Sequence, residues 1–347
     1  MNRIFIGIDV HQRQSYYCAL DKRGSCLGHE SISTDRKSLK ELVRRYAAVG
    51  DVHVAIETGG STWWVAGVLK ESGADVHAVN AHELKLIAHS KRKTDKYDSK
   101  VLADLLRCEG LPERVHMPGE ATMRLRSMLR TRKWLVRQRA QAMTRAKAVM
   151  RHVGVAVKPR MFHTANSWEE VLGSHPDLEA LIRTMYEMWT MSSIQLKGME
   201  RLLGNILPAD EERMAILLSI PGIGPVTAWT LIACVEDIGR FKRADQLVAY
   251  AGLVPSENSS GDRQRTGSIT KRGRSDLRDV YIQAAWATLR SSHPGTAYMK
   301  RFFYRIMHRR CSQVAIVALA KKLLIISYHV LKQRTPFAID RYEAKAA

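Results

Sequence analysis

Two short apolar runs that each end in an acid constrain the fold of this chain more than any other feature. Residues 3–9 read Arg-Ile-Phe-Ile-Gly-Ile-Asp, and residues 52–57 read Val-His-Val-Ala-Ile-Glu. Runs of this length and composition are typical of buried strands. If the two strands are parallel neighbours, their carboxyl ends meet at one edge of a sheet. We therefore expect Asp9 and Glu57 to lie close together.

The segments around these runs predict a mixed α/β sheet. Three strand-like segments come first, and helical and strand-like segments then alternate, which is typical of this fold class. The expected strands are residues 3–9, 15–20, 26–33, 52–57 and 75–80, with helices over 36–48 and 62–72.

Two further acids, Asp95 and Asp98, lie three residues apart in a predicted helix over residues 91–108. This spacing puts both on one face of the helix. If that face crosses the strand ends, four acids converge, and two bare charges about 4 Å apart repel by about 4 kcal/mol at an effective dielectric of 20. Mg²⁺ prefers such carboxylate oxygens, and two ions would bracket a scissile phosphate. The alternative is that the acids are ordinary turn, cap and surface ion-pairing residues.

Charge and composition indicate a polyanionic partner. Lys and Arg total 55 against 34 Asp and Glu, a formal net charge of +21, although a merely solubilising basic surface is the alternative. The five cysteines form no CxxC pair and are odd in number, which argues against a zinc ribbon or a disulfide framework and fits a reducing cytosol. No signal peptide is expected, and the longest apolar run, 314–320, is shorter than a membrane span. We therefore expect a cytoplasmic protein without a membrane partner.

Residues 121–168 contain no acid but many arginines and lysines. Apolar positions in this segment repeat at seven, and a second such seam runs from Leu178 to Ile206. The pattern predicts two long helices folded back on each other as an antiparallel coiled-coil arm, with an ordinary helical bundle as the alternative. The basic side chains expected to contact nucleic acid here are Arg124, Arg132, Arg137 and Arg139.

Two later segments are typical of phosphate binding. Pro221-Gly222-Ile223-Gly224 lies between predicted helices over 211–220 and 225–237 and matches a helix-hairpin-helix turn, in which Gly222 and Gly224 would let backbone N–H groups approach phosphates. The alternative is a tight turn without a ligand. Residues 254–274 predict a polar loop, either a passive phosphate-binding loop or one carrying a nucleophilic serine. Its cations are Arg263, Arg265, Lys271 and Arg272, and predicted helices over 275–291 and 311–332 follow.

The order of these motifs resembles one family, the DEDD transposases of compact insertion sequences. This family comprises the bridge-RNA-guided recombinases and includes the pilin-gene DNA invertases. The matching motifs span residues 4 to 337, essentially the whole chain. They are Gly7-Ile-Asp9-Val-His11, Ile56-Glu57-Thr-Gly-Gly60, Lys93-Thr-Asp95-Lys-Tyr-Asp98, Ile220-Pro-Gly-Ile-Gly224, Ala251-Gly-Leu-Val-Pro255, Ser260-Gly261 and Thr270-Lys-Arg-Gly273.

The resemblance implies three domains. Residues 1–118 would form a RuvC-like domain of the RNase H fold that binds Mg²⁺ through Asp9, Glu57, Asp95 and Asp98. Residues 119–207 would form the coiled-coil arm, and residues 208–347 a mostly helical transposase domain whose nucleophile is Ser260. Ser259 lies beside it, and Asp262 and Arg263 stand where relatives often have small or polar residues.

The resemblance also implies the reaction and the partners. Ser260 would attack a DNA phosphate to give a phosphoserine-linked end, and strand exchange and religation would follow. A structured guide RNA would supply sequence readout between donor and target DNA. Because the acids and the serine lie in separate domains, a homo-oligomer, a dimer or tetramer, is expected to join them, in the bacterial cytoplasm at the nucleoid.

Three alternatives remain open on the sequence. A RuvC-like junction nuclease or a protein-only invertase would use the acids with water and would not need Ser260. An actin-like phosphotransferase would explain Gly7-Ile-Asp9 and Glu57-Thr-Gly-Gly60 as a nucleotide site. A non-catalytic nucleic-acid scaffold would need none of these acids.

Overall fold

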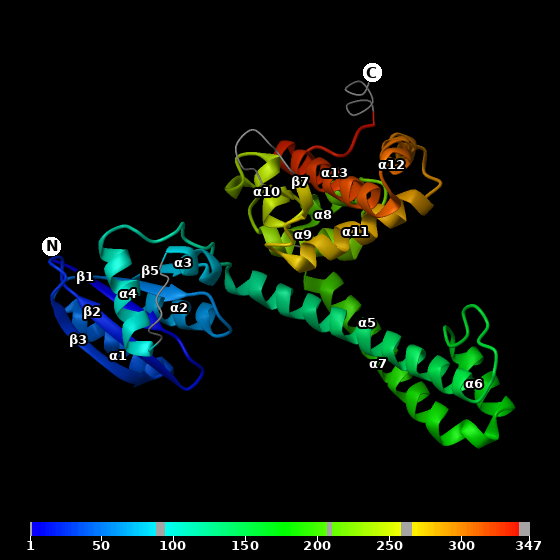
Figure 1. Ribbon diagram of the computed structural model, residues 1–347, viewed down its shortest axis with the longest axis horizontal. Coiled ribbons are helices and arrows are strands. Elements are labelled where there is room, and N and C mark those ends of the chain that lie inside the picture. The colour runs from blue at the N-terminus through cyan, green and yellow to red at the C-terminus, as the bar shows by residue number, and fades with distance from the viewer. Residues whose placement is uncertain (1, 88–93, 207–209, 258–265, 340–347) are drawn as a thin grey trace. The chain divides into compact units, whose positions relative to one another are not determined.

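The chain folds as two compact units, residues Met1–Pro118 and Gly119–Ala347 (Figure 1). The structure is a computed structural model, and it describes residues 2–87, 94–206, 210–257 and 266–339.

The first unit is built on a five-stranded sheet in the order β3-β2-β1-β4-β5. Strands β1, β2 and β3 form an antiparallel meander, whereas β4 and β5 extend the sheet in parallel with β1. The mixed α/β prediction is therefore confirmed. The strands are β1 (Arg3–Asp9), β2 (Gln14–Leu20), β3 (Cys26–Ser33), β4 (Asp51–Glu57) and β5 (Asp75–Val79).

Helices cover both faces of this sheet. Alternate residues of β1, namely Ile4, Ile6 and Ile8, are buried in one core with α1 (Arg36–Ala47) and α2 (Thr62–Glu71). The other residues of β1 face the opposite side, where α4 (Asp95–Arg107) packs. This two-sided burial explains why β1 and β4 read as continuous apolar runs.

Helix α4 begins at Asp95, later than the predicted start at residue 91. Thr94 is the N-cap residue, and its side chain accepts a hydrogen bond from the backbone N–H of Tyr97. Such a cap satisfies one of the free N–H groups of the first helical turn. Residues 91–93 lie outside the described part of the chain. A short helix, α3 (Ala81–Ile87), follows β5 and was not predicted.

In the second unit, α5 (Glu120–His152) and α7 (Glu179–Ile206) lie side by side in opposite directions (Figure 1). Met150 near the end of α5 shares a core with Ile182 near the start of α7, and Leu125 shares one with Leu203 at the other end of the pair. The predicted pair of long antiparallel helices is therefore present. An additional helix, α6 (Ala165–Ser174), caps the far end through buried Trp168 and was missed in the sequence.

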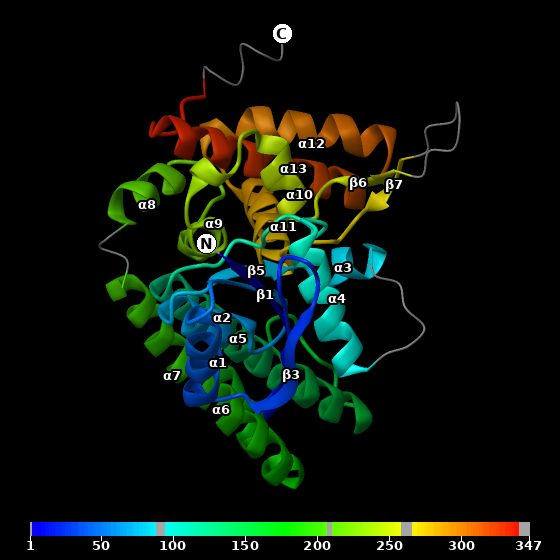
Figure 2. The same cartoon turned by 90° about the vertical axis from the view of Figure 1, so that its left-hand side faces the viewer.

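The remaining helices of the second unit pack around α13 (Ser312–Gln333), as Figure 2 shows for α10, α11 and α12. By length and composition α13 qualifies as a membrane span, which the shorter apolar run 314–320 did not indicate. However, its apolar side chains form the core of these helices. The helices that share this core with α13 are α8 (Glu211–Leu218), α9 (Pro225–Val235), α10 (Ala244–Tyr250), α11 (Ser275–Arg290) and α12 (Ala297–Arg309).

The segment predicted as a loop over 254–274 contains two short paired strands, β6 (Pro255–Glu257) and β7 (Thr266–Ile269). The sequence did not predict these strands, because the segment is rich in Gly, Ser and Arg and because strands this short show little of the alternation that predicts longer ones. Helices α10 and α12 were also not predicted.

Candidate functional site

The carboxyl ends of β1 and β4 lie next to each other. The parallel register pairs Ile8 with Ile56, so that Asp9 and Glu57 occupy adjacent positions one residue further on. Side chains alternate between the faces of a strand, so both acids belong to the same face as Phe5 and Ala55, which pack against α4. The sequence-based expectation that these acids end neighbouring strands agrees with this register.

A glycine allows α4 to lie directly on this face. A Cβ atom added to Gly7 would lie 2.0 Å from the carbonyl oxygen of Ser99 and 2.5 Å from the backbone nitrogen of Ala103. No side chain fits in that space. The first turn of α4, which carries Asp95 and Asp98, is thereby brought to the carboxyl end of β1.

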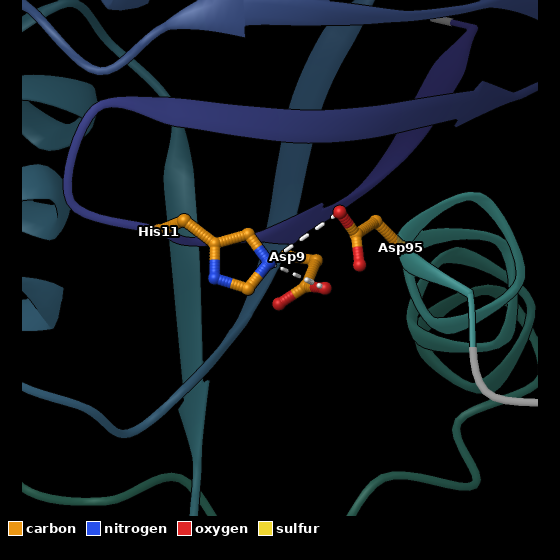
Figure 3. Close-up of side chains that lie close together, drawn as sticks. All are labelled: Asp9, His11 and Asp95. Carbon is orange, nitrogen blue, oxygen red and sulfur yellow. Dashed lines mark ion pairs between the residues drawn. The ribbon is translucent and has the colours of Figure 1, made fainter.

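Three side chains converge at this point (Figure 3). His11 Nε2 lies 3.4 Å from Asp9 Oδ2 and 3.6 Å from Asp95 Oδ2. One ligand atom from each of the three residues lies within 4.8 Å of the other two. Asp9 is the most enclosed, with 22% of its side chain exposed, against 62% for Asp95.

Burial and neighbouring charges perturb Asp9. Burial is the largest cause and raises the pKa of its carboxyl; the nearby His11 opposes the rise, whereas Asp95 and Asp98 add to it. Two acids from α4 therefore act electrostatically on the acid at the end of β1. A bound cation would favour the ionised carboxylate and so lower the pKa of Asp9 again.

The donor set fits a divalent cation. Carboxylate oxygens suit Mg²⁺ and Mn²⁺, and an imidazole nitrogen is a common ligand for several divalent metals. His11 was not predicted as a site residue, although its spacing two residues after Asp9 could have indicated it. Its imidazole nitrogen is one of the three possible ligand atoms that lie together here.

Two of the acids, Asp95 and Asp98, could also serve only to stabilise the start of α4. Asp95 and Asp98 lie in the first turn of α4, where the positive end of the helix dipole stabilises carboxylates by about 0.3–1 kcal/mol. This accounts for acids at a helix start but not for their convergence on a third, enclosed acid from β1.

The predicted helix-hairpin-helix turn divides its two glycines between different roles. Gly222 adopts a φ of +95°, and a Cβ there would lie 2.0 Å from Thr288 Oγ1 of α11, so this glycine serves close packing. Gly224 is the N-cap residue of α9, and a Cβ there would meet no atom within 4 Å. The start of α9 is thus sterically open to an anion at Gly224.

The arginines of α5 differ in what they contact. Arg124 pairs with Glu120 at 2.6 Å, and Arg132 donates two hydrogen bonds to Glu200 Oε1 on α7. Arg137 is exposed and Arg139 half-buried, and neither pairs with an acid among the described residues. Sequence reasoning missed Arg126, which is buried and donates to the carbonyls of Ala233 and Cys234 at the end of α9.

The predicted nucleophile, Ser260, follows β6 in the sequence. Ser259, Ser260, Arg263 and Arg265 lie outside the described residues. Lys271 and Arg272 are exposed after β7, in a turn fixed by close approach of Gly252 to the Arg272 carbonyl and of Gly273, at φ +117°, to the Tyr250 carbonyl. The chain that follows β7 is therefore packed closely against the end of α10.

Comparison with known proteins identifies the family. A transposase model of the DEDD IS110 type matches residues 6–154, and a model described as "Transposase IS116/IS110/IS902 family" matches residues 214–307. The chain carries the two domains of the IS110/IS116 transposase family. The first match contains all four predicted acids, and the second contains the helix-hairpin-helix turn.

Full-length relatives agree with this assignment. A protein of Pseudomonas aeruginosa named a probable family 20 transposase is 27% identical, with 96% of this chain and 98% of the relative aligned. The transposase for insertion sequence element IS1328 of Yersinia enterocolitica is 26% identical over 97% and 99%. The pilin gene-inverting protein of Moraxella bovis is 26% identical over 97% and 98%.

This IS110/IS116-family chain is therefore a DNA transposase or recombinase, an enzyme that acts on DNA. The family's use of a divalent metal agrees with the acidic cluster at Asp9, His11 and Asp95.

Proposed function

We propose that this transposase cuts and rejoins DNA through a phosphoserine at Ser260, with Mg²⁺ held by Asp9, Glu57, Asp95 and Asp98. The observation that carries the proposal is the convergence of Asp9 and Asp95 where α4 crosses the end of β1. Ionising an enclosed acid that has a raised pKa and faces two further acids costs free energy unless a cation is bound there.

The architecture supports an RNase H-like, RuvC-type assignment for residues 1–118. Acids end two central parallel strands, and the helix that covers those ends supplies two more. We further propose that residues 119–207 act as the arm and residues 208–347 as the domain that carries the nucleophile.

The chemistry assigned to each group follows from its position. Mg²⁺, when bound, would stabilise the negative charge that develops on the scissile phosphate. Asp9 and Glu57 would hold it from the sheet edge, and Asp95 and Asp98 from α4. The Ser260 oxygen would give up its proton and bond to phosphorus, and the bond from phosphorus to one deoxyribose oxygen would break. That oxygen would take up a proton and leave as a free DNA hydroxyl. Attack by another DNA hydroxyl on the phosphoserine would restore Ser260.

The net charge of +21 supports a role for RNA as well as DNA. We propose that a structured guide RNA pairs with donor and target, while the protein holds the backbones. We also propose a homo-oligomer, a dimer or tetramer, in the cytoplasm at the nucleoid. The phosphate contacts proposed for it are Arg124, Arg137, Arg139, Gly222, Gly224, Arg263, Arg265, Lys271 and Arg272, whereas Arg132, also predicted from the sequence, is assigned to its ion pair with Glu200.

The pilin gene-inverting relatives favour DNA inversion as an outcome, and the second candidate is therefore a protein-only DNA invertase. A cleavage assay separates the two. The DNA that flanks the gene is incubated with the protein and Mg²⁺, with and without RNA transcribed from the adjacent non-coding sequence. We expect cleavage only with RNA and metal, and none from Ser260→Ala. Cleavage without RNA would favour the invertase, and full cleavage by Ser260→Ala would favour a junction nuclease.

A further inference from the structure

An exposed tryptophan lies among cations on α5. Arg130, Lys133, Trp134 and Arg137 follow the spacing i, i+3, i+4 and i+7, which places them on one face of the helix. Trp134 is 56% exposed, although a side chain of its size normally finds apolar cover in a folded protein. It is one of the most exposed aromatic side chains among the described residues.

This face borders two adjoining cavities within the second unit. Trp134 lines one of about 440 Å³, opposite Gly273, Arg274 and Ser275 at the start of α11. The second, of about 680 Å³, lies between α5, α9 and α11. Arg130, Lys133 and Arg137 line both, so the two cavities adjoin, and we call them together the α5 groove.

The cations of the α5 groove are not equally available. Lys133 pairs with Asp279 at 2.5 Å, and Arg274 pairs with Asp276 at 2.6 Å. Arg130 and Arg137 are exposed, and neither makes an ion pair or hydrogen bond with a residue that the structure describes. Two guanidinium groups therefore flank the tryptophan one helical turn away on either side, Arg137 without an acid partner among the described residues and Arg130 in an electrostatic interaction with Asp276.

The larger cavity has a mainly apolar surface, although five cations and two acids, Asp276 and Asp279, also line it. Its walls include Leu129, Val136, Val226 and Val280. Thr227 also lines it and is 8% exposed, and its hydroxyl makes no hydrogen bond to a described residue. A cavity of this volume accepts a ligand of nucleoside size, and the combination of apolar walls with a free hydroxyl suits a flat, polar-edged ring.

We propose that the α5 groove binds an unpaired segment of nucleic acid. One base stacks on Trp134, a neighbouring base enters the cavity beside Thr227, and Arg130 and Arg137 contact the phosphates. A duplex keeps its base faces covered by stacking and cannot cover the tryptophan, so the occupant is single-stranded RNA or DNA. This inference rests on the proposed function, because strand exchange and guide pairing both require unpaired strands.

The groove is also close in sequence to the predicted nucleophile loop. Strand β7 ends at Ile269, and Arg274 and Ser275 of the groove follow within six residues. The groove would hold an unpaired strand next to the hairpin whose loop carries Ser260.

The test measures affinity for fluorescent oligonucleotides by anisotropy, using the full-length protein. The probes are a single-stranded oligo-dT, an oligo-rU of equal length, an abasic strand and a duplex. Because stacking on an aromatic ring is worth about 1–3 kcal/mol per base, Trp134→Ala should weaken single-strand binding by roughly 5- to 150-fold. Trp134→Phe should retain most of the affinity. Trp64→Ala, which removes another exposed tryptophan in the first unit, is the matched control and should match the wild type.

Salt dependence separates stacking from charge. Arg137→Gln should reduce the slope of log K against log salt by about 0.7 for single strands, whereas Trp134→Ala should leave the slope unchanged. Comparison of oligo-rU with oligo-dT shows whether the natural occupant is RNA or DNA.

The proposal is overturned if Trp134→Ala binds single strands as tightly as Trp64→Ala does. It is also overturned if Trp134→Ala weakens binding to the duplex and to the abasic strand as much as it weakens binding to the intact single strands. An unaltered single-strand affinity with loss of association between protein chains would instead indicate a protein-binding face. Because the readout is binding, a protein that binds through the groove but fails to cleave would sink the proposed function alone.

Discussion

The backbone carbonyl of Ser99 occupies the space that a side chain on Gly7 would need, at 2.0 Å from an ideal Cβ. Helix α4 can therefore rest directly on β1. This contact brings the acid that ends β1 close to the acids that begin α4, and it makes the proposed metal site depend on a residue that has no functional group.

Replacing Gly7 with Ala should disturb both stability and the acidic site. The clash is with backbone, which cannot rotate away, so α4 must shift. We expect a loss of about 3 kcal/mol in the free energy of unfolding and a matching loss of divalent-metal affinity, measured by urea unfolding and calorimetric titration with Mn²⁺. Gly67→Ala, in α2 where a Cβ meets nothing within 4 Å, should be neutral or slightly stabilising. Equal effects of the two substitutions would contradict this.

The raised pKa of Asp9 predicts that the free energy of unfolding of the metal-free protein depends on pH. Because the folded state binds this proton more tightly than the unfolded chain, the contribution of Asp9 to stability is present below its ordinary pKa of 3.8 and is lost as pH rises through the raised value. Asp9→Asn, which stays neutral, should therefore be more stable than wild type near pH 7, with a difference that shrinks toward about pH 4. Thermal unfolding in chelator tests this; a difference independent of pH would be inconsistent with it.

Asp95 and Asp98 should be needed for metal binding but not for the fold. Asp95→Asn and Asp98→Asn should each weaken Mn²⁺ binding by about tenfold or more and abolish strand cleavage, while nucleic-acid affinity is retained. Asp104→Asn is the control on the same helix, because Asp104 pairs with Arg107 away from the first turn. If either variant failed to fold, or bound Mn²⁺ like the control, a metal role for that acid would be wrong.

The sequence predicted those parts of the fold and of the candidate site that leave a long periodic pattern of apolar residues. The apolar strands β1 and β4 and the amphipathic helix α1 were predicted nearly residue by residue, because burial leaves a periodic signal. His11 was missed because it lies on an exposed turn, where no periodicity marks it. The position of α4 was predictable only in part, since the approach at Gly7 is a tertiary contact between segments some 90 residues apart.

The arginines of α5 illustrate the same limit. Their number predicted a nucleic-acid surface, but the sequence could not show that Arg126 is buried against α9 or that Arg132 contacts Glu200. Those partners lie beside α5 only after α7 and α9 have packed against it. The availability of Arg130 and Arg137 could likewise be seen only in the structure.

Arg132 should therefore contribute mainly to the stability of the helix pair. Arg132→Gln should lower the free energy of unfolding by about 1 kcal/mol, because Glu200 loses two hydrogen bonds in a partly exposed site. Its salt dependence of nucleic-acid binding should stay close to that of wild type, in contrast to Arg137→Gln. Chemical unfolding and binding at several salt concentrations test this, and a reduced salt slope for Arg132→Gln would show that it contacts phosphate after all.

The most direct measurement of the central claim is the identity of the residue that becomes linked to DNA. The protein is incubated with its DNA, RNA and Mg²⁺, the reaction is stopped by denaturation, and the covalent adduct is digested and mapped by mass spectrometry. The account predicts a nucleotide phosphate on Ser260, retained in Ser259→Ala and absent from Ser260→Ala and Asp9→Asn. Cleaved DNA with no adduct, or an adduct on another residue, would contradict it.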